Sequence, residues 1–473
     1  MATKGKGAVG VFHPVGVGYL QRLATPLIWG GIEVNSQKGI QCATGALACL
    51  VAAGSLGLVT AARMPRPAAS HPKINLTLLT FDTGPGILEK PAVAEFMKLH
   101  PNIHVSLQSS SSTYYYTKLL TELATGQGPD VFLIGDTDVP TFVDAGVVAN
   151  LSPLFQHHAF GLNASKYYPN VLNVGKVRGK IYYVPKDWAD ESVEYNVTMF
   201  KKAHLPLPKA GWTWAQFIQD AKKLTVVKNG KTVQYGAQLP GTWLRAGLEE
   251  FEAVFGGHVL SPNGKTASGY LNSPTSIRAI TYYLNMYRQD HISPTPTQMA
   301  GYAHVDLFET GRVAMEPTGP WSLSTYQRVP HFQFGVAPMP RLTPKSKPAT
   351  TVFWSGWAVN KRSPHLKAAE ELAAFFASPW WQYKDKAFAM DAEKGPWIAQ
   401  SVKTLPQLKV YFKQEPNIAP LEPTKTQNWT KDVSPALTNM IEAAILKPHS
   451  NIASLVRTAT NQIDAALKST YGG

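Results

Sequence analysis

Residues 113–154 constrain the fold more than any other stretch of the chain. Leu119, Leu120 and Leu123 recur at the spacing of one face of a helix. Residues 131–134 form a short apolar run, which is typical of a strand buried on both faces. A second helical segment follows and closes at a glycine. The order helix, strand, helix predicts a parallel α/β unit.

A polar elbow follows this strand at residues 135–138. Open α/β sheets bind their ligands beyond the carboxyl ends of their strands, so the elbow is a candidate ligand contact. It carries two carboxylates, Asp136 and Asp138. Two such groups without further oxygen donors nearby seldom hold a metal ion. We therefore expect them to accept hydrogen bonds, and we expect no metal or cofactor.

Chain length and composition indicate a folded protein of more than one core. The chain has 473 residues, of which 44% are hydrophobic and 16% are charged. That length exceeds what a single small core accommodates and fits two lobes with an additional N-terminal piece. Aromatic residues reach 11%. Most of these rings serve cores, but sugar sites also use flat apolar faces.

The net charge of +14 is distributed unevenly. Residues 1–73 contribute +6 and the following 400 residues contribute +8. The body is therefore only mildly basic and shows no Lys/Arg-rich stripe, so we expect no nucleic-acid partner. A basic surface would suit an anionic wall or membrane, or an acidic habitat.

The N-terminal segment predicts export of the body. Residues 39–62 contain no charged side chain and are long enough to span a bilayer as a helix. They fit a cleaved signal peptide or a retained signal anchor. Lipid attachment at Cys49 is a third possibility, although the residues before it depart from the usual lipoprotein pattern. Cys42 and Cys49 are the two cysteines of the chain, so the body contains neither disulfide nor thiolate site.

Local patterns predict several further elements. A strand is expected at 74–81, a helix at 91–99, a strand at 351–360 and a helix at 363–377. Thr213 is placed to cap a helix that runs through Leu224. A final amphipathic helix should begin at Ile452 and continue to about Leu467.

Short motifs recur along the body in a fixed order. They are His100-Pro-Asn-Ile-His-Val105, Gly126-Gln-Gly-Pro-Asp130, Gly179-Lys-Ile-Tyr-Tyr-Val-Pro185, Phe308-Glu-Thr-Gly-Arg-Val-Ala-Met315 and Gly319-Pro-Trp321. Each motif alone is common. Their order over residues 74–467 resembles the extracellular solute-binding proteins of ABC importers, in particular the sugar-binding family that includes maltose-binding protein.

This resemblance implies an α/β, two-lobed, periplasmic-binding-protein-like fold with crossing hinge strands, preceded by an N-terminal signal or anchor segment. A hinge is expected near residues 185–193. The implied division is a leader at 1–38, the signal or anchor at 39–62, a linker at 63–73, lobe I at 74–187 and 341–378, and lobe II at 188–340 and 379–473.

The resemblance also implies ligand contacts. The first group consists of Thr83 and Gly84 in the first loop, Asp136 and Asp138 in the elbow, Asp187 and Trp188 at the hinge, and Trp321 in the Gly-Pro-Trp turn. The second group, for which core packing is an equal alternative, consists of Trp243, Trp354, Trp357 and Trp397.

The implied function is that of an extracellular substrate-binding component of an ABC transporter, which captures a sugar and delivers it to permease subunits. Alternatives are a binder of a polyamine, phosphodiester or metal chelate, and a membrane-anchored sugar sensor. Asp187, Asp190, Glu191 and Glu194 could supply the carboxyl pair of a glycosidase, but a hinge loop explains them without chemistry. We expect an exported, monomeric protein that is not an enzyme.

Overall fold

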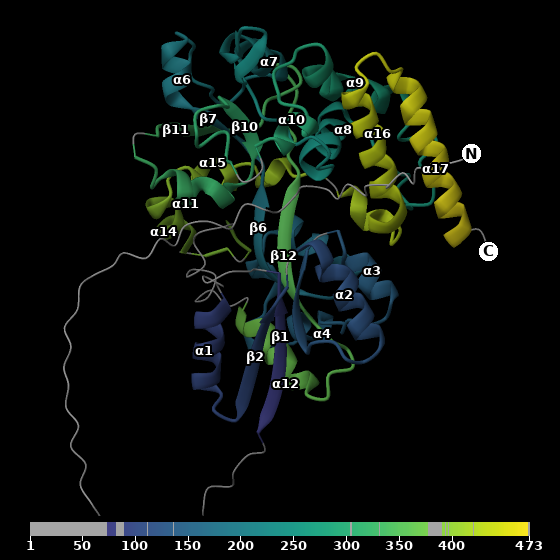
Figure 1. Ribbon diagram of the computed structural model, residues 1–473. Coiled ribbons are helices and arrows are strands. Elements are labelled where there is room, and N and C mark those ends of the chain that lie inside the picture. The colour runs from purple at the N-terminus through teal and green to yellow at the C-terminus, as the bar shows by residue number, and fades with distance from the viewer. Residues whose placement is uncertain are drawn as a thin grey trace, which may run out of the picture.

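Two β-sheets organise the molecule into two lobes (Figure 1). The larger sheet has the strand order β13-β6-β12-β3-β1-β2, and the smaller sheet has the order β10-β7-β11. We call the parts built on them lobe I and lobe II. The computed structural model describes residues 73–81, 89–110, 112–135, 137–302, 305–330, 332–376, 390–392, 394–395, 397–419 and 421–471.

Lobe I begins as a parallel α/β unit and ends with antiparallel strands. Its strands are β1 (Ile74–Thr80), β2 (Ile103–Ser109), β3 (Val131–Gly135), β6 (Val184–Asp190), β12 (Val352–Val359) and β13 (Met390–Asp391). Strand β1 pairs in parallel with β2 and β3, whereas β12 pairs antiparallel with β3 and β6. The helices of this region are α1 (Glu89–Leu99), α2 (Ser112–Ala124), α3 (Val139–Asp144), α4 (Ser152–Gln156), α5 (Pro169–Val174) and α12 (Leu366–Phe376). The predicted helix, strand and helix of residues 113–154 are confirmed.

Asp130 holds three parts of lobe I together. Its Oδ2 accepts hydrogen bonds from the backbone N (2.8 Å) and the hydroxyl (2.9 Å) of Thr77 in β1. Its Oδ1 accepts from the hydroxyl of Ser363, just before α12, at 2.6 Å. Hydrogen bonds to a charged carboxylate are about twice as strong as neutral ones. The aspartate of the Gly-Gln-Gly-Pro-Asp turn is therefore structural.

Lobe II surrounds a small antiparallel sheet with helices. Strand β7 (Ser192–Asn196) lies between β10 (Met315–Thr318) and β11 (Phe334–Ala337). The helices are α6 (Val197–Lys202), α7 (Trp214–Leu224), α8 (Glu250–Phe255), α9 (Pro274–Arg288), α10 (Pro296–Ala300), α11 (Leu323–Tyr326), α16 (Ser434–Leu446) and α17 (Ile452–Tyr471). Two short hairpins complete the strands of the described residues. The first, β4 (Lys176–Val177) with β5 (Lys180–Ile181), packs on the core of lobe I, and the second, β8 (Val226–Lys228) with β9 (Lys231–Gln234), belongs to lobe II.

Helix α7 shows how local sequence defines an element. Thr213 accepts a hydrogen bond from the backbone N of Gln216, and the Gln216 side chain accepts one from the backbone N of Thr213. This reciprocal capping box confirms the predicted start of the helix. Trp214 and Phe217 lie on its buried face and contact each other, with ring centroids 5.1 Å apart.

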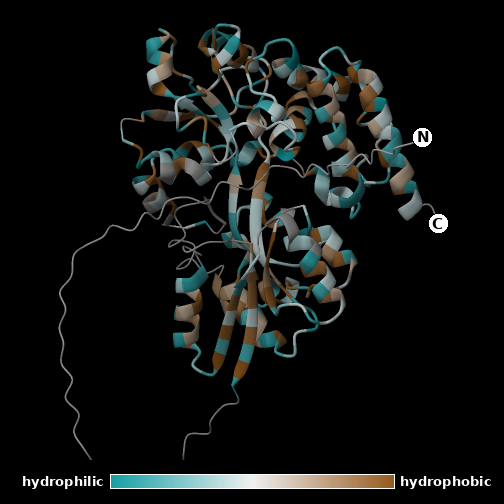
Figure 2. Cartoon of the chain, in the orientation of Figure 1, coloured by the Kyte–Doolittle hydropathy of each residue, from teal (hydrophilic) through white to brown (hydrophobic). Residues whose placement is uncertain are grey.

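Hydrophobic side chains form a separate core in each lobe, and Figure 2 shows the apolar strands of the larger sheet. The predicted boundary of lobe II at residue 379 is wrong in part. Leu405, Leu408 and Tyr411, which lie in and around α14 (Trp397–Thr404) and α15 (Leu408–Phe412), pack in the core of lobe I. Their apolar surface is covered by that core, and the second core resumes only at Trp429.

The chain passes between the lobes at three places in the described residues. Glu191 alone separates β6 from β7, inside the expected hinge interval. The segment between β11 and β12 returns to lobe I. The third connection leads from α15 through η5 (Glu415–Asn417) and η6 (Glu422–Lys425) to η7 (Trp429–Val433) in lobe II. The fold class predicted from the motifs is confirmed.

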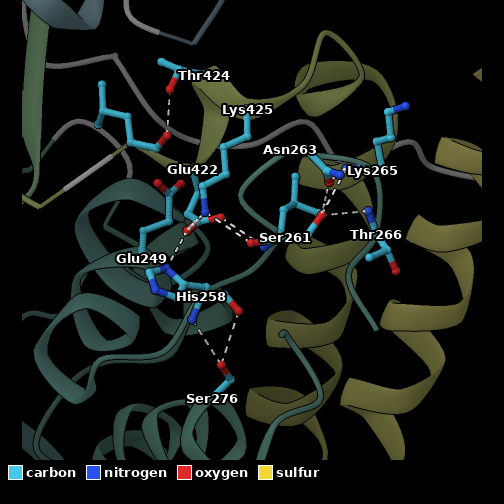
Figure 3. A network of polar contacts seen from close by, with 12 residues as sticks. Glu249, His258, Ser261, Asn263, Lys265, Thr266, Ser276, Glu422, Thr424 and Lys425 are labelled. Atoms are coloured by element: carbon cyan, nitrogen blue, oxygen red, sulfur yellow. Dashed lines mark hydrogen bonds and ion pairs between the residues drawn. The ribbon is translucent and has the colours of Figure 1, made fainter. Parts of the chain in front are cut away.

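The third connection is anchored to lobe II by the buried carboxylate of Glu422 (Figure 3). Its oxygens accept hydrogen bonds from the backbone N of Leu260 (3.0 Å) and from Lys425 Nζ (2.6 Å), and Nδ1 of His258 lies 3.1 Å away. Lys425 also donates to the carbonyl of Leu260. One acidic side chain thus fixes the place where the chain re-enters lobe II.

Among the described residues, no helix has both the length and the apolar character required to cross a membrane. The predicted leader, signal or anchor and linker at residues 1–72 lie outside the described part of the chain.

Candidate ligand-binding site

Strands β6 and β12 separate two sets of side chains. In their antiparallel register Ser355 lies opposite Asp187, and Trp354 lies opposite Trp188. Successive side chains of a strand point to opposite faces of the sheet. Asp187, Phe353 and Ser355 therefore share one face, and the two tryptophans share the other.

The tryptophan face belongs to the core of lobe I. Trp188 has no exposed surface, and Trp354 is 5% exposed. Trp354 stacks on Tyr183 with centroids 4.2 Å apart. Trp357 points to the other face, two residues after Ser355, but it is also fully buried in this core and contacts Phe376 at 4.7 Å. In this conformation the three tryptophans pack among other side chains and offer no surface to a ligand.

On the opposite face, Phe353 contacts two other partly exposed aromatic rings. Trp243 lies 5.8 Å from Trp321 and 4.9 Å from Phe353, measured between ring centroids, and Trp321 lies 5.7 Å from Phe353. We call these three residues the ring cluster. Trp243 is 39% exposed, and the other two are half-buried. Phe353 comes from β12 of lobe I, and both tryptophans come from lobe II, so the ring cluster is shared by the two lobes.

Asp187 is held on the same face of the sheet as Phe353. Its Oδ1 accepts a hydrogen bond from the Ser355 hydroxyl at 2.5 Å, and its Oδ2 lies 2.8 Å from Lys186 Nζ. The Asp187 side chain is 16% exposed, whereas that of Lys186 is 6% exposed. The carboxylate therefore has a fixed orientation and still reaches the surface.

Arg245 is a buried residue that contacts Phe353 of the ring cluster. It is 4% exposed and belongs to η3 (Arg245–Glu249), which follows Trp243. Its guanidinium carbon lies 5.5 Å from the centre of the Phe353 ring, a cation–π contact. The guanidinium also pairs with Glu249 at 3.4 Å and donates to the carbonyl of Val352. This buried cation thus ties lobe II to β12.

Several buried carboxyl groups surround the first connection. Burial raises the pKa of Glu191 to about 8, an effect that Arg245 and the Thr351 hydroxyl partly offset. Burial likewise raises the pKa of Glu194 to about 8, although the hydrogen bond from Tyr411 acts to lower it. The pKa of Glu250 is also well above its ordinary value, chiefly because of burial and then because of Glu191. With pKa values of about 8, Glu191 and Glu194 are largely protonated at neutral pH, which avoids the large cost of burying several anions together.

The described residues contain no group of three or more His, Cys, Asp or Glu side chains placed to hold a metal ion. In the hinge region the structure places the partly exposed rings of the ring cluster on the same side of the sheet as the oriented carboxylate of Asp187.

The family model of the bacterial extracellular solute-binding protein matches residues 82–383 of this chain. The chain belongs to this family. The match covers the strands from β2 to β12 and includes the entire ring cluster.

Individual solute-binding proteins are similar to this chain at low sequence identity. A binding protein of Brucella abortus (strain 2308) is 23% identical over 271 residues, which are 57% of this chain and 63% of that protein. The chain thus spans less than two thirds of that relative. The maltodextrin-binding protein MdxE of Bacillus subtilis (strain 168) is 22% identical over 340 residues, 70% of this chain and 76% of that protein.

The structure of the ABC substrate-binding protein Lmo0181 of Listeria monocytogenes, in complex with cycloalternan, superposes with a TM-score of 0.74. It is 25% identical and covers 85% of this chain and 99% of its own. The two-lobed solute-binding fold therefore accounts for nearly all of that protein and most of this one.

The structure brings together some of the residues predicted from the sequence and separates others. Trp321 and Trp243 meet in the ring cluster, and Asp187 lies on the sheet face from which Phe353 enters that cluster. Asp138 is 5% exposed, and its carboxylate accepts hydrogen bonds from the hydroxyls of Thr137 (2.9 Å) and of Thr430 in lobe II (3.5 Å). Asp138 therefore contacts the other lobe as well as its own elbow.

Four predicted positions cannot be placed in the same way. Thr83, Gly84 and Asp136 lie outside the described residues. Trp397 is the first residue of α14.

Sequence reasoning missed Phe353 and Arg245. The alternation within residues 352–357 was a usable signal, because it places Phe353 on the face opposite Trp354. No local pattern marked Arg245, whose role depends on the packing of η3 against β12.

Proposed function

We propose that this protein is the substrate-binding component of an ABC importer and that it captures a sugar or oligosaccharide between its lobes. The observation that carries the proposal is the ring cluster, which draws Phe353 from lobe I and Trp243 and Trp321 from lobe II. Asp187 supplies an oriented acceptor nearby on the same strands.

The chemistry of these groups suits a hydroxyl-rich ligand. Sugar rings present C–H patches that pack on flat aromatic faces, and tryptophan offers the largest such face. Sugar hydroxyls need acceptors once they are removed from water, because each buried unpaired polar group costs about 1–3 kcal/mol. Asp187 can accept from one or two hydroxyls while Ser355 and Lys186 keep it in place.

The two-lobed architecture supplies the mechanism. Ligand contacts both lobes, and hinge bending about the three connections encloses it. A ligand can favour the closed form only through contacts that the open form lacks. A site shared by the lobes provides such contacts, and the closed form is then the one that the permease recognises.

Two of the similar proteins favour glucose oligosaccharides as the first ligands to test. MdxE is named for maltodextrin, and Lmo0181 was solved with cycloalternan. By extension we propose transport of an oligosaccharide of this kind, with permease subunits in the membrane as partners.

We further propose that the protein acts outside the cytoplasmic membrane as a monomer, binds no nucleic acid and catalyses no reaction. The acidic residues of the first connection support the last point. The side chains of Asp190, Glu191 and Glu194 are buried. They lie in β6, between β6 and β7, and in β7, and so belong to the strands that join the lobes.

Calorimetric titration of the purified full chain tests the proposal. The panel comprises maltose, maltotriose, a longer maltodextrin, cycloalternan, spermidine and glycerophosphocholine. We expect saturable heat with at least one sugar and none with the two non-sugars. Saturable binding of a non-sugar alone would replace the sugar with that class, and release of free glucose during the titration would identify an enzyme.

A further inference from the structure

The side chain of Gln414 contacts both of the other connections between the lobes. Gln414 lies in the third connection, between α15 and η5. Its Nε2 donates to the carbonyl of Glu191, in the first connection, at 2.5 Å and lies 2.6 Å from the hydroxyl of Ser192, the first residue of β7. Its Oε1 accepts from the backbone N of Met339, in the second connection, at 2.8 Å. One amide therefore links all three.

Thr350 forms a second joint between the same three segments. Its hydroxyl accepts from the backbone N of Glu191 at 3.0 Å and lies 3.2 Å from the Glu191 carbonyl. Its backbone pairs with the third connection, donating to the carbonyl of Asn417 (3.1 Å) and accepting from the N of Ala419 (2.9 Å). Glu191, the single residue between β6 and β7, is thus hydrogen-bonded to both Gln414 and Thr350.

Both joints are removed from solvent. Gln414 is 2% exposed, and Thr350 and Glu191 have no exposed surface. Buried backbone groups need partners, and here a side-chain amide provides the partner that a sheet or helix would otherwise supply. The connections can therefore change their mutual orientation only by altering these hydrogen bonds or by admitting water.

We propose that Gln414 is a positioning residue for ligand capture, because its amide fixes the three connections about which the lobes turn and so sets the balance between open and closed forms. This inference rests on the proposed function for its ligand-dependent part. The hinge equilibrium itself exists without ligand and is measured separately.

Replacing Gln414 with leucine should favour the open form. The N–H of Met339 then loses its acceptor, and the carbonyl of Glu191 loses one donor. Water can satisfy these groups only where the connections separate, so the variant gains relatively more from opening. Because ligand binds the closed form, we expect its affinity to fall about tenfold, within the usual range of coupling between a binding site and a conformational change.

Distance measurement between the lobes provides the test. The full chain with Cys42→Ser and Cys49→Ser is labelled with a fluorophore pair at Lys98→Cys in α1 and Lys228→Cys in β8, both exposed positions. We expect Gln414→Leu to shift the energy-transfer distribution of the ligand-free protein toward longer distances. Adding maltotriose as the probe should then shift it back less completely than in the parent.

Asn428→Leu is the matched control. Asn428 is 7% exposed, and its amide donates to Asp432 and to Thr470, both in lobe II. This variant loses a buried amide at the lobe II end of the third connection and leaves the hydrogen bonds among the three connections in place. It should lose thermal stability but keep the parent distance distribution.

Thr350→Val gives a second variant that keeps the side-chain volume and is therefore suited to fold. We expect the same direction of shift from it. Unchanged ligand-free distributions in both Gln414→Leu and Thr350→Val would overturn the proposal. If maltotriose fails to act on the parent while the ligand-free shift is present, maltotriose is not the ligand and the hinge role stands.

Discussion

Two sets of aromatic rings lie on opposite faces of the same pair of strands and have different surroundings. Trp188 and Trp354 face the core of lobe I, where Tyr183 and neighbouring rings cover them. Phe353, one residue before Trp354, faces Trp243 and Trp321 and keeps part of its ring in solvent. The first set holds one lobe together, and the second set joins the two lobes.

The contrast shows that aromatic content alone does not locate a carbohydrate site. What distinguishes the ring cluster is that its members come from both lobes and remain partly exposed, so a ligand bound there gains contacts by closure. The buried set has the same chemical identity but is satisfied within one lobe. The following experiments separate the two roles.

The largest effect is expected from Trp188→Ala. Removing a fully buried tryptophan leaves a cavity, so the free energy of unfolding should fall by about 3–5 kcal/mol in urea denaturation. Phe353→Ala should lower it less, since that ring is half-buried. Equal losses in the two variants would remove the distinction between the faces.

Trp321→Ala should weaken sugar binding more than it weakens the fold. Loss of a central aromatic anchor typically costs about 2 kcal/mol or more, which corresponds to roughly 10–100-fold in dissociation constant by calorimetry. Phe160→Ala is the control, because Phe160 is an aromatic residue that is 39% exposed and lies outside the ring cluster. Undiminished binding by Trp321→Ala would exclude the stacking role.

Burial affects carboxyl groups as well as aromatic rings, because it changes their pKa values. Burial raises the pKa of Glu252 in α8 from an ordinary 4.5 to about 8. Between these values the folded chain holds a proton that the unfolded chain releases, so the free energy of unfolding should fall as pH rises from 4.5 to 8.

Glu252→Gln should flatten this dependence by at least about 1.4 kcal/mol, because a tenfold difference in proton affinity between the folded and unfolded chains already corresponds to that free energy. Urea midpoints measured at several pH values for parent and variant provide the comparison. Parallel pH profiles for the two proteins would show that Glu252 titrates normally.

The smallest effect is expected from Ser355→Ala. Its hydroxyl orients Asp187 at 2.5 Å. Losing one such bond costs about 1 kcal/mol, so affinity for the sugar should fall about fivefold while the urea midpoint changes little. A loss confined to stability would make Asp187 a structural residue of the sheet.

Regular elements were largely predictable because their signals are local. The capping box at Thr213 and the apolar run of β3 each depend on residues a few positions apart, and both were located correctly. The lobe boundary after residue 378 was not, because Leu405, Leu408 and Tyr411 look alike in sequence whichever core covers them.

The residues of the candidate site also fall into two groups, those that sequence motifs indicated and those that only the structure revealed. Trp321 and Asp187 could be named because they lie in recognisable motifs. The burial of Trp188 and the exposure of Phe353 follow from the pairing of β6 with β12, whose partners are more than 150 positions apart in the chain.

By itself the amino-acid order determined the α/β character, because periodicity, capping and turn chemistry act over short distances. The order of its short motifs indicated the two-lobed family and the approximate position of the hinge through their resemblance to known proteins. Only the tertiary structure decided which rings meet across the lobes and that Gln414 joins the three connections. Such contacts depend on how distant segments pack, and no local pattern records which partner a side chain will find.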